Sequence, residues 1–385
     1  MAMWHERGFR VLVVASVAAL VAAVGIAHAS AEDGAAGATD PSVQRTGETP
    51  RTDASGTAGT TRADAVARQP RILLVGDSIT QGMTGDHTWR YRAYHLLLDQ
   101  GVVPDFVGYR TDTVDPVTKE RVEDYADPDF DRDHAGVAGM TATDPEYDVV
   151  GLTAATRPDL VVVSLGVNDA LQGHDPDDVA AGLRGIVDDV RSVAPYADVV
   201  LAEQTTTWLP GVPAVNERIR ALADELDTER SRVALARVPA GYDATGDTWD
   251  GIHPNAVGEI AIAHEVVAAL SELGYAAKPA TVQDLPAPGP DRSVEGARVV
   301  DRSPTSLRLA WSLPRGVTKV HIEGRDLTTG GRWTPLATSA WGAEEQRLQG
   351  FAPGHSYELR LRPSRGTALS DERWSTEVTG RTPTS

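Results

Sequence analysis

A regular alternation of two kinds of segment runs from residue 70 to residue 275 of this chain and limits the folds open to it. Apolar runs such as RILLVG (71–76), DLVVVSLG (159–166) and DVVLAEQ (198–204) are separated by longer stretches with helical periodicity. Continuous apolar runs are typical of strands buried on both faces, and strands that alternate with helices form parallel sheets. The sequence therefore predicts an α/β domain, a three-layer α/β/α sandwich around a flavodoxin-like parallel sheet of about five strands.

The pattern changes after this domain. Residues 276–290 end in three closely spaced prolines and are predicted to be a linker. Beyond them, SLRLAW (306–311), KVHIEGRDL (319–327) and YELRLRP (357–363) alternate apolar and polar residues between turns rich in Gly and Pro. A period of two residues without a helical period predicts a small all-β sandwich over residues 291–383.

The N-terminal residues predict export. Residues 1–29 join a basic start with Arg7 and Arg10 to an apolar stretch and the small-residue exit AHA, which is typical of a signal peptide. The apolar stretch of 16 residues is shorter than the roughly 20 needed to span a bilayer. We therefore expect cleavage after Ala29, a secreted soluble protein and no membrane span. Residues 30–69 lack apolar periodicity and are predicted to be a disordered leader.

Composition excludes several kinds of site and partner. The chain contains no cysteine, which excludes disulfides, thiolate metal sites and cysteine nucleophiles. Residues 70–280 carry 36 acidic and 16 basic side chains, whereas residues 281–385 carry 12 acidic and 14 basic ones. An acidic body repels phosphate backbones and anionic lipid surfaces. We therefore expect a neutral substrate and no nucleic-acid partner.

Four short motifs follow predicted strands or precede predicted helices: GDSIT (76–80), GVAGM (136–140), GVND (166–169) and DGIHP (250–254). Sites of open α/β sheets form at the carboxyl ends of the strands, so we expect these motifs to converge there. Together they contain what acyl transfer to a hydroxyl requires, namely a nucleophile, a base, a group that orients the base, and donors for an oxyanion.

The residue types suggest a role for each side chain. Ser78 is the candidate nucleophile because it begins a helix whose N-terminus favours developing negative charge. His253 is the candidate base, and Asp250 lies three residues earlier, within reach of the imidazole. Asn168 offers a side-chain amide, and Gly139 offers a backbone N–H with no side chain to block an ester. The alternative, in which Ser78 is only a helix cap, requires no distant histidine or asparagine.

This set of motifs, over roughly residues 70–275, resembles the SGNH hydrolases, the GDSL-type esterases and lipases. The resemblance implies a catalytic triad of Ser78, Asp250 and His253. It also implies an oxyanion hole formed by Ser78, Gly139 and Asn168, with Gly139 preferred to Gly136 within its motif.

The first two motifs also indicate a branch of that family. Ile79 and Thr80 follow GDS where GDSL enzymes have leucine, and HAGVAGMT (134–141) is a relaxed second motif. Both features are similar to the branch that includes secreted carbohydrate esterases. The resemblance implies hydrolysis of carboxylic esters through an acyl-enzyme, with acetyl groups on carbohydrate as the expected substrate and no metal or organic cofactor.

Other functions stay open from the sequence. A lipase or phospholipase of the same fold would favour long apolar loops, but the long insertion at 110–148 is acidic. A glycosidase would need paired carboxylates in a cleft instead of this set. Residues 290–383 resemble a fibronectin type III module with Tyr357 as its corner tyrosine. That resemblance implies a spacer or adhesive role, and a module that binds polysaccharide or cell wall is the remaining alternative.

Two further features have alternative interpretations. Trp89, Trp208 and Trp249 are expected either to form a platform that stacks on a sugar or to pack in the core. The acids of DPDFDRDH (127–134) are expected to be a solvated loop, with a calcium loop as the alternative. An EF-hand is excluded because its sixth and twelfth positions would be Arg132 and Ala138.

Overall fold

The computed structural model describes residues 69–282, 285–370 and 373–385, which belong to a single unit. The predicted signal peptide (1–29) lies outside these residues, as does the predicted leader up to residue 68. Within the described ranges no helix is both long enough and apolar enough to span a membrane.

The structure begins with an α/β domain and continues with a β module. The strands of the α/β domain are β1 (Arg71–Gly76), β2 (Asp105–Val107), β3 (Thr113–Val114), β4 (Arg121–Val122), β5 (Ala135–Gly136), β6 (Leu160–Ser164), β7 (Asp198–Ala202) and β8 (Val233–Ala236). Its helices are α3 (Ser78–Gln81), α4 (Thr88–Leu98), α5 (Val149–Thr156), α6 (Val167–Gln172), α7 (Pro176–Val193), α8 (Val212–Leu226) and α9 (Ala256–Glu272).

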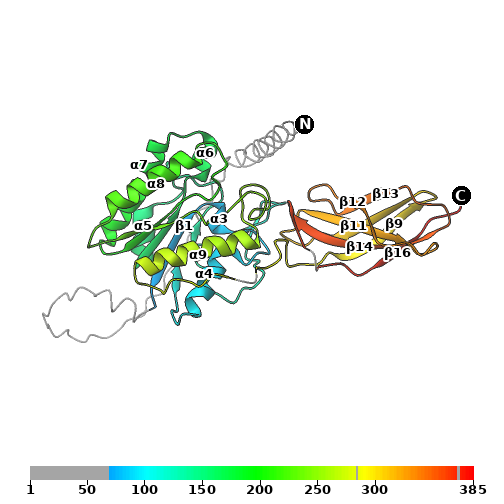
Figure 1. Cartoon of the computed structure of the whole chain (residues 1–385), viewed down its shortest axis with the longest axis horizontal. Coiled ribbons are helices and arrows are strands. Elements are labelled where there is room, and N and C mark those ends of the chain that lie inside the picture. The colour runs from blue at the N-terminus through cyan, green and yellow to red at the C-terminus, as the bar shows by residue number, and fades with distance from the viewer. Residues whose placement is uncertain (1–68, 283–284, 371–372) are drawn as a thin grey trace, which may run out of the picture. The chain divides into compact units, whose positions relative to one another are not determined.

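The central sheet has the parallel order β2-β1-β6-β7-β8, and the short β5 adds to β1. Helices α4 and α9 cover one face of the sheet, and α5, α7 and α8 cover the other (Figure 1). The predicted three-layer α/β domain with a parallel sheet of about five strands is confirmed.

Burial on both faces explains the continuous apolar strands. Leu73 and Val75 of β1 pack into the cluster that contains the inner face of α7, and Ile72 and Leu74, which alternate with them along the strand, are equally buried. Successive strand residues point to opposite faces, so both faces require apolar side chains. The buried positions of α7 recur every three or four residues, which is why its span was predictable: Val179, Leu183, Ile186, Val187 and Val190.

The β module is a sandwich of two antiparallel sheets, as predicted. Its strands are β9 (Glu295–Ser303), β10 (Ser306–Ser312), β11 (Lys319–Asp326), β12 (Thr334–Thr338), β13 (Glu345–Gln349), β14 (Ser356–Arg365), β15 (Ala368–Leu369) and β16 (Val378–Arg381). One sheet has the order β13-β10-β9, and the other has the order β12-β11-β14-β15 with β16 on β14. Tyr357 is buried, and its hydroxyl accepts a hydrogen bond from the Ala352 N–H at 2.8 Å.

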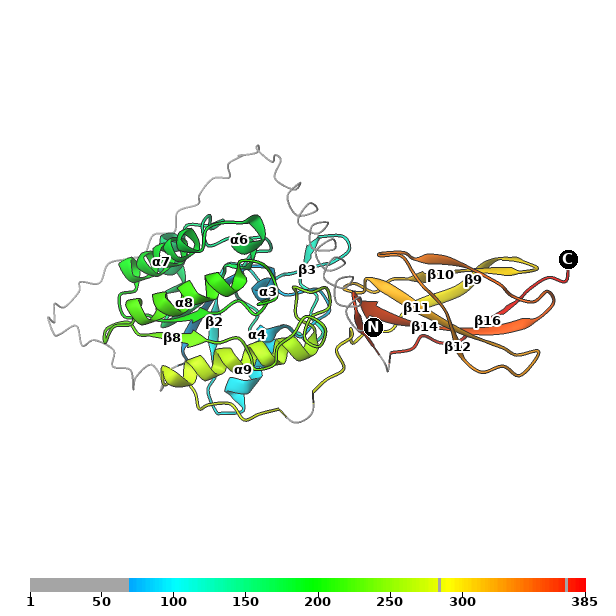
Figure 2. The same cartoon turned by 45° about the horizontal axis from the view of Figure 1, so that its top comes forward.

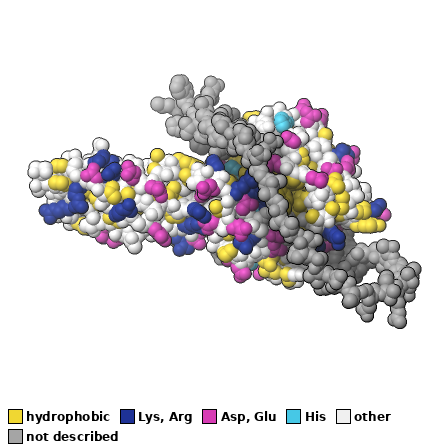
Figure 3. Space-filling view, turned by 180° about the vertical axis from the view of Figure 1, so that it is seen from behind, with side chains coloured by type: hydrophobic (Ala, Val, Ile, Leu, Met, Phe, Trp, Pro, Cys, Tyr) yellow, Lys and Arg dark blue, Asp and Glu magenta, His cyan; other side chains and the backbone are white. Residues whose placement is uncertain are grey.

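On the surface drawn in Figure 3, side chains of both charges are interspersed.

Strand register brings three loops to one end of the α/β sheet. Gly76, the last residue of β1, pairs with Ser164 of β6 and with Gly136 of β5. The segments that leave these three positions carry Ser78, Asn168 and Gly139. Figures 1 and 2 both place α3 and α6 at the same end of the sheet.

Candidate active site

Asp77, the residue before Ser78, caps helix α3. Its carboxylate accepts a hydrogen bond from the Ile79 N–H at 2.9 Å. Capping is the role that the sequence alone could also assign to Ser78. Because the aspartate performs it, the Ser78 hydroxyl is available for another contact, and its Oγ lies 2.9 Å from His253 Nε2.

Asp250 and His253 form a compact corner before α9. His253 Nδ1 lies 2.8 Å from Asp250 Oδ2, and Asp250 Oδ1 accepts hydrogen bonds from the His253 and Ile252 N–H groups at 2.8 and 3.0 Å. The Trp249 N–H donates to the His253 carbonyl at 3.0 Å, which closes the turn. Ser78, His253 and Asp250 therefore form one continuous path of hydrogen bonds.

The charge of Asp250 fixes the form of the imidazole. Burial acts to raise the pKa of Asp250, but the charge of His253 and the hydrogen bonds it receives outweigh burial and hold this pKa below its ordinary value. A carboxylate at this position accepts the Nδ1 proton of His253. The Nε2 lone pair is then directed at the Ser78 hydroxyl, as a general base requires.

Gly139 and Gly136 differ in what their backbone N–H groups can do. The Gly136 N–H donates to His134 Nδ1 at 3.0 Å, and a Cβ at Gly136 would lie 2.6 Å from the Gln81 nitrogen. Gly136 is therefore required for packing. Gly139 has a φ of +89°, and within the described residues neither its N–H nor that of Ser78 has a hydrogen-bond partner. Both N–H groups can therefore donate a hydrogen bond to an oxyanion.

Asn168 lies between these two backbone segments. Its Nδ2 is 3.0 Å from the Met140 carbonyl oxygen, beside Gly139, and 3.4 Å from Asp77 Oδ2, beside Ser78. Its amide therefore lies against the neighbours of both unpartnered N–H groups. The structure thus brings together all five residues that the sequence singled out for chemistry.

Gln81 holds the loop that carries Gly139, and the sequence reasoning missed it. The side chain is fully buried, and its Oε1 accepts from the Ala138 N–H at 2.9 Å while its Nε2 donates to Asp112 Oδ2 at 2.9 Å. Asp169 performs a similar task, since its carboxylate accepts hydrogen bonds from the N–H groups of Ala142 and Thr143. A polar residue directly after GDSIT was the available signal for Gln81, but nothing in the sequence links it to position 138.

Comparison with known proteins agrees with this geometry. Residues 74–259 match the GDSL-like lipase/acylhydrolase family. These residues form a GDSL-type acylhydrolase domain. A β sandwich follows this GDSL-type domain along the chain.

Three similar proteins illustrate the two parts of the chain. A multidomain esterase of Ruminococcus flavefaciens is 25% identical over an alignment 226 residues long, which covers 51% of this chain and 28% of that protein. A family 3 carbohydrate esterase from Talaromyces cellulolyticus is 28% identical, with a TM-score of 0.45 over 53% of this chain and 97% of its own. The FN5 domain of Drosophila Lar is 17% identical, with a TM-score of 0.20 over 24% of this chain and 96% of its own.

The three tryptophans of the GDSL-type domain lie in different surroundings. Trp89 and Trp249 are each only 2% exposed, so neither presents a ring face to solvent, and the platform interpretation does not hold for these two. Trp89 is a buried residue of α4 and lines a small cavity together with Ile262 and Val266 of α9. Trp208 is partly exposed, stacks on Tyr242, and donates from its Nε1 to the Gly251 carbonyl at 2.9 Å. Of the three, Trp208 alone keeps a position from which a ligand could be contacted.

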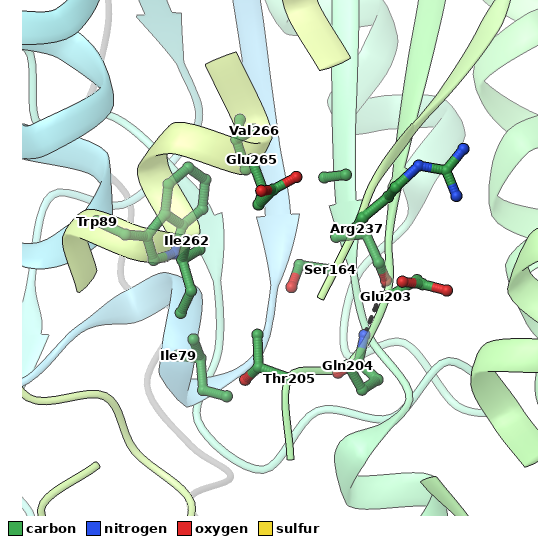
Figure 4. Close-up of a pocket in the computed structure, with 12 residues that line it drawn as sticks. Ile79, Trp89, Ser164, Glu203, Gln204, Thr205, Arg237, Ile262, Glu265 and Val266 are labelled. Carbon is green, nitrogen blue, oxygen red and sulfur yellow. Dashed lines mark hydrogen bonds between the residues drawn. The ribbon is translucent and has the colours of Figure 1, made fainter. Parts of the chain in front are cut away.

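Two cavities lie near the GDSL-type site but outside it. The first has a volume of about 20 Å³, enough for one water molecule, and Figure 4 shows Ile79, Trp89 and Ile262 on one side of it and Gln204 and Arg237 on the other. A second cavity, of about 220 Å³, is lined by charged side chains of the domain and by the proline-rich linker. Neither lining includes Ser78, Asp250 or His253.

The acidic segment 127–133 uses its carboxylates to hold turns. Asp127 accepts from the Asp129 N–H and from the Tyr91 hydroxyl, both at 2.9 Å. Asp131 accepts from the N–H groups of Phe106 and Asp133. Throughout the part of the chain that the structure describes, no group of three or more His, Asp or Glu side chains could hold a metal ion. The geometry favours turn-capping acids over the calcium-loop alternative.

Asp77 makes the stability of this GDSL-type domain depend on pH. Burial raises the pKa of Asp77 from 3.8 to about 7, with the Ile79 N–H and His253 acting to lower it and Asp169 to raise it. As pH rises from 4 to 7, the unfolded chain loses the Asp77 proton at a lower pH than the folded protein does. The free energy of unfolding should therefore fall as pH rises through this window, and Asp77→Asn should flatten that slope in urea unfolding.

The exposed N-cap of α7 offers a matched control for this measurement. Asp175 accepts from the Asp177 N–H much as Asp77 accepts from Ile79. Asp175→Asn should leave the wild-type pH slope in place. An unchanged slope in Asp77→Asn would contradict the prediction.

Proposed function

We propose that this protein is a secreted serine esterase that removes short acyl groups, chiefly acetyl, from carbohydrate. The observation that carries the proposal is the path from the Ser78 hydroxyl to His253 at 2.9 Å and from His253 to Asp250 at 2.8 Å. The catalytic roles of these three residues are part of the proposal, as are the oxyanion roles of Ser78, Gly139 and Asn168.

Acylation begins at the Ser78 oxygen. This oxygen attacks the ester carbonyl carbon while its proton moves to His253 Nε2, and Asp250 stabilises the resulting imidazolium. The negative oxygen of the tetrahedral intermediate accepts hydrogen bonds from the Ser78 and Gly139 N–H groups and from the Asn168 amide. The intermediate then collapses, the bond to the alcohol oxygen breaks, and His253 donates its proton to that oxygen.

Deacylation repeats these steps with water. His253 removes a proton from a water molecule, whose oxygen attacks the acyl carbon, and the same donors hold the oxyanion. The Ser78 oxygen leaves and recovers its proton from His253. The carboxylic acid is released, and the enzyme returns to its starting state without a cofactor.

Three observations support a short acyl group on a neutral carbohydrate. Neither cavity described above adjoins Ser78, so neither offers a long acyl chain an apolar site. Residues 70–280 carry 36 acidic against 16 basic side chains, which favours an uncharged substrate. Trp208 is partly exposed, and its indole N–H donates a hydrogen bond to the carbonyl of Gly251, which lies between Asp250 and His253 in the sequence. The signal sequence supports secretion, and N-terminal sequencing of exported protein should find Ser30 first.

A series of esters with one alcohol and different acyl groups tests the acyl preference. We expect kcat/KM to fall by about tenfold or more from acetyl to butyryl and further to octanoyl, because a site for a short acyl group gives added methylenes no favourable contact. Acetate release from acetylated xylan should accompany this preference. A preference for octanoyl esters would contradict the proposal and favour a lipase.

A further inference from the structure

The β module forms hydrogen bonds with Trp249, the residue that precedes Asp250. The Trp249 carbonyl accepts hydrogen bonds from the Thr367 N–H at 2.8 Å and from the Thr367 hydroxyl at 3.1 Å. Gly366 has a φ of +52°, and a Cβ added there would lie 1.9 Å from the Trp249 oxygen. The turn between β14 and β15 therefore packs directly against Trp249, at the start of the turn that contains Asp250 and His253.

The rings of His253, Trp249 and Trp341 form a row that leads from His253 to the surface. The indole of Trp249 stacks on His253 with ring centres 5.3 Å apart and planes inclined by 15°. Trp341 of the β module lies against Trp249 with ring centres 6.2 Å apart. The His253 and Trp341 rings are therefore at most about 11.5 Å apart. Trp249 is 2% exposed whereas Trp341 is 43% exposed, so the row of rings ends at an accessible indole.

The loop that carries Trp341 is held before any ligand arrives. The Gly342 N–H donates to the Thr318 carbonyl at 2.8 Å, and the Ser339 N–H donates to the Val320 carbonyl at 2.8 Å. Gly342 also approaches the β3–β4 hairpin, where a Cβ would lie 2.8 Å from Val117. A side chain on a loop held in this way loses little conformational freedom when a ligand binds.

The mechanism decides which part of an ester these rings would meet. His253 donates its proton to the departing alcohol oxygen, so the alcohol portion lies on the His253 side. The N–H of Gly139 and the amide of Asn168 define the oxyanion side. Trp249 stacks on His253 and Trp341 lies against Trp249, so the exposed Trp341 ring is on the side of the alcohol portion and not on the oxyanion side.

Two other tryptophans of the β module have arginine guanidinium groups over their rings. Trp333 is covered by the guanidinium groups of Arg325 and Arg360, 4.7 and 4.3 Å from its ring centre. Trp374 is covered by Arg360 and Arg362, at 3.8 and 5.0 Å. Trp341, by contrast, is among the exposed large apolar side chains of the described residues.

We propose that Trp341 forms a stacking subsite for a sugar ring of the alcohol portion, so that the β module contributes a specificity-determining residue to the esterase site. The apolar face of a sugar ring packs on an indole, and the hydroxyl groups at its edge stay in water. This inference rests on the proposed carbohydrate substrate and identifies which part of the molecule would recognise it.

The test compares Trp341→Ala with wild type in the full chain on two acetate esters, acetylated xylotriose and ethyl acetate. We expect KM for acetylated xylotriose to rise about three- to tenfold, with kcat within twofold of wild type. Kinetics on ethyl acetate should not change, because this substrate has no ring to stack. Trp341→Phe should keep most of the affinity, and Trp333→Ala on the same module should match wild type.

The outcomes separate this inference from the proposed function. An equal loss on both esters would mean that Trp341 only supports His253, and an unchanged KM for acetylated xylotriose would remove the subsite; each overturns the inference alone. Wild-type enzyme that hydrolyses ethyl acetate but not acetylated xylotriose would overturn the carbohydrate substrate and the inference with it. If Trp341→Ala does not fold, Trp341→Leu keeps apolar packing on Trp249 without a flat aromatic face, and the same selective loss is expected.

Discussion

Ser78→Ala should lower kcat for acetate ester hydrolysis by about 10⁴-fold or more while leaving the fold intact. The Ser78 oxygen is the atom that His253 Nε2 contacts at 2.9 Å, and no other hydroxyl is hydrogen-bonded to that nitrogen in the described chain. Stability should not change, because helix α3 is capped by Asp77 and not by the serine. Hydrolysis followed in a pH-stat, together with thermal unfolding, measures both quantities.

Ser164→Ala is the matched control for this prediction. Ser164 ends β6 at the position paired with Gly76, but its side chain lines the small cavity of Figure 4 and not the catalytic path. The control should retain wild-type turnover. Wild-type turnover in Ser78→Ala would refute the assignment of the nucleophile.

The sequence predicts those features of the fold that are repeated along an element. Helix α7 was predictable because its apolar residues recur at helical spacing, and β1 because its run is apolar throughout. Helix α5, VVGLTAAT, escaped prediction because it is short, contains Gly151 and has no polar face. A short helix of this kind is held by what it packs against and leaves no periodic signal.

Residue chemistry located the candidate site, but contacts between distant segments could not be predicted from it. Ser78 and Asp77 are both residues that cap helices, and only the backbone geometry determines which one does so. The Thr367 contact with Trp249 spans 118 positions of the chain and has no counterpart in composition or period. The burial of Trp249 by the β module therefore could not be foreseen from its place beside Asp250.

Asp250→Asn should lower kcat by about 10³- to 10⁴-fold without disordering the corner that contains it. An asparagine Oδ1 can still accept the N–H groups of Ile252 and His253, so the turn is retained. Its amide nitrogen would then face His253 Nδ1 as a donor. The imidazole would be left with its proton on Nε2, pointing at Ser78, in the tautomer that cannot act as a base. Initial rates on an acetate ester measure the loss, and circular dichroism checks the fold.

The double variant Ser78→Ala/Asp250→Asn distinguishes a catalytic path from two independent losses. If Asp250 acts only through His253 on the Ser78 hydroxyl, Asp250 has no catalytic effect once that hydroxyl is removed. The double variant should then be no slower than Ser78→Ala. Asp243→Asn, which alters a nearby acid that accepts only from Thr245 and Gly246, should keep wild-type activity. Multiplicative losses in the double variant would mean that Asp250 stabilises the site by a route other than the imidazole.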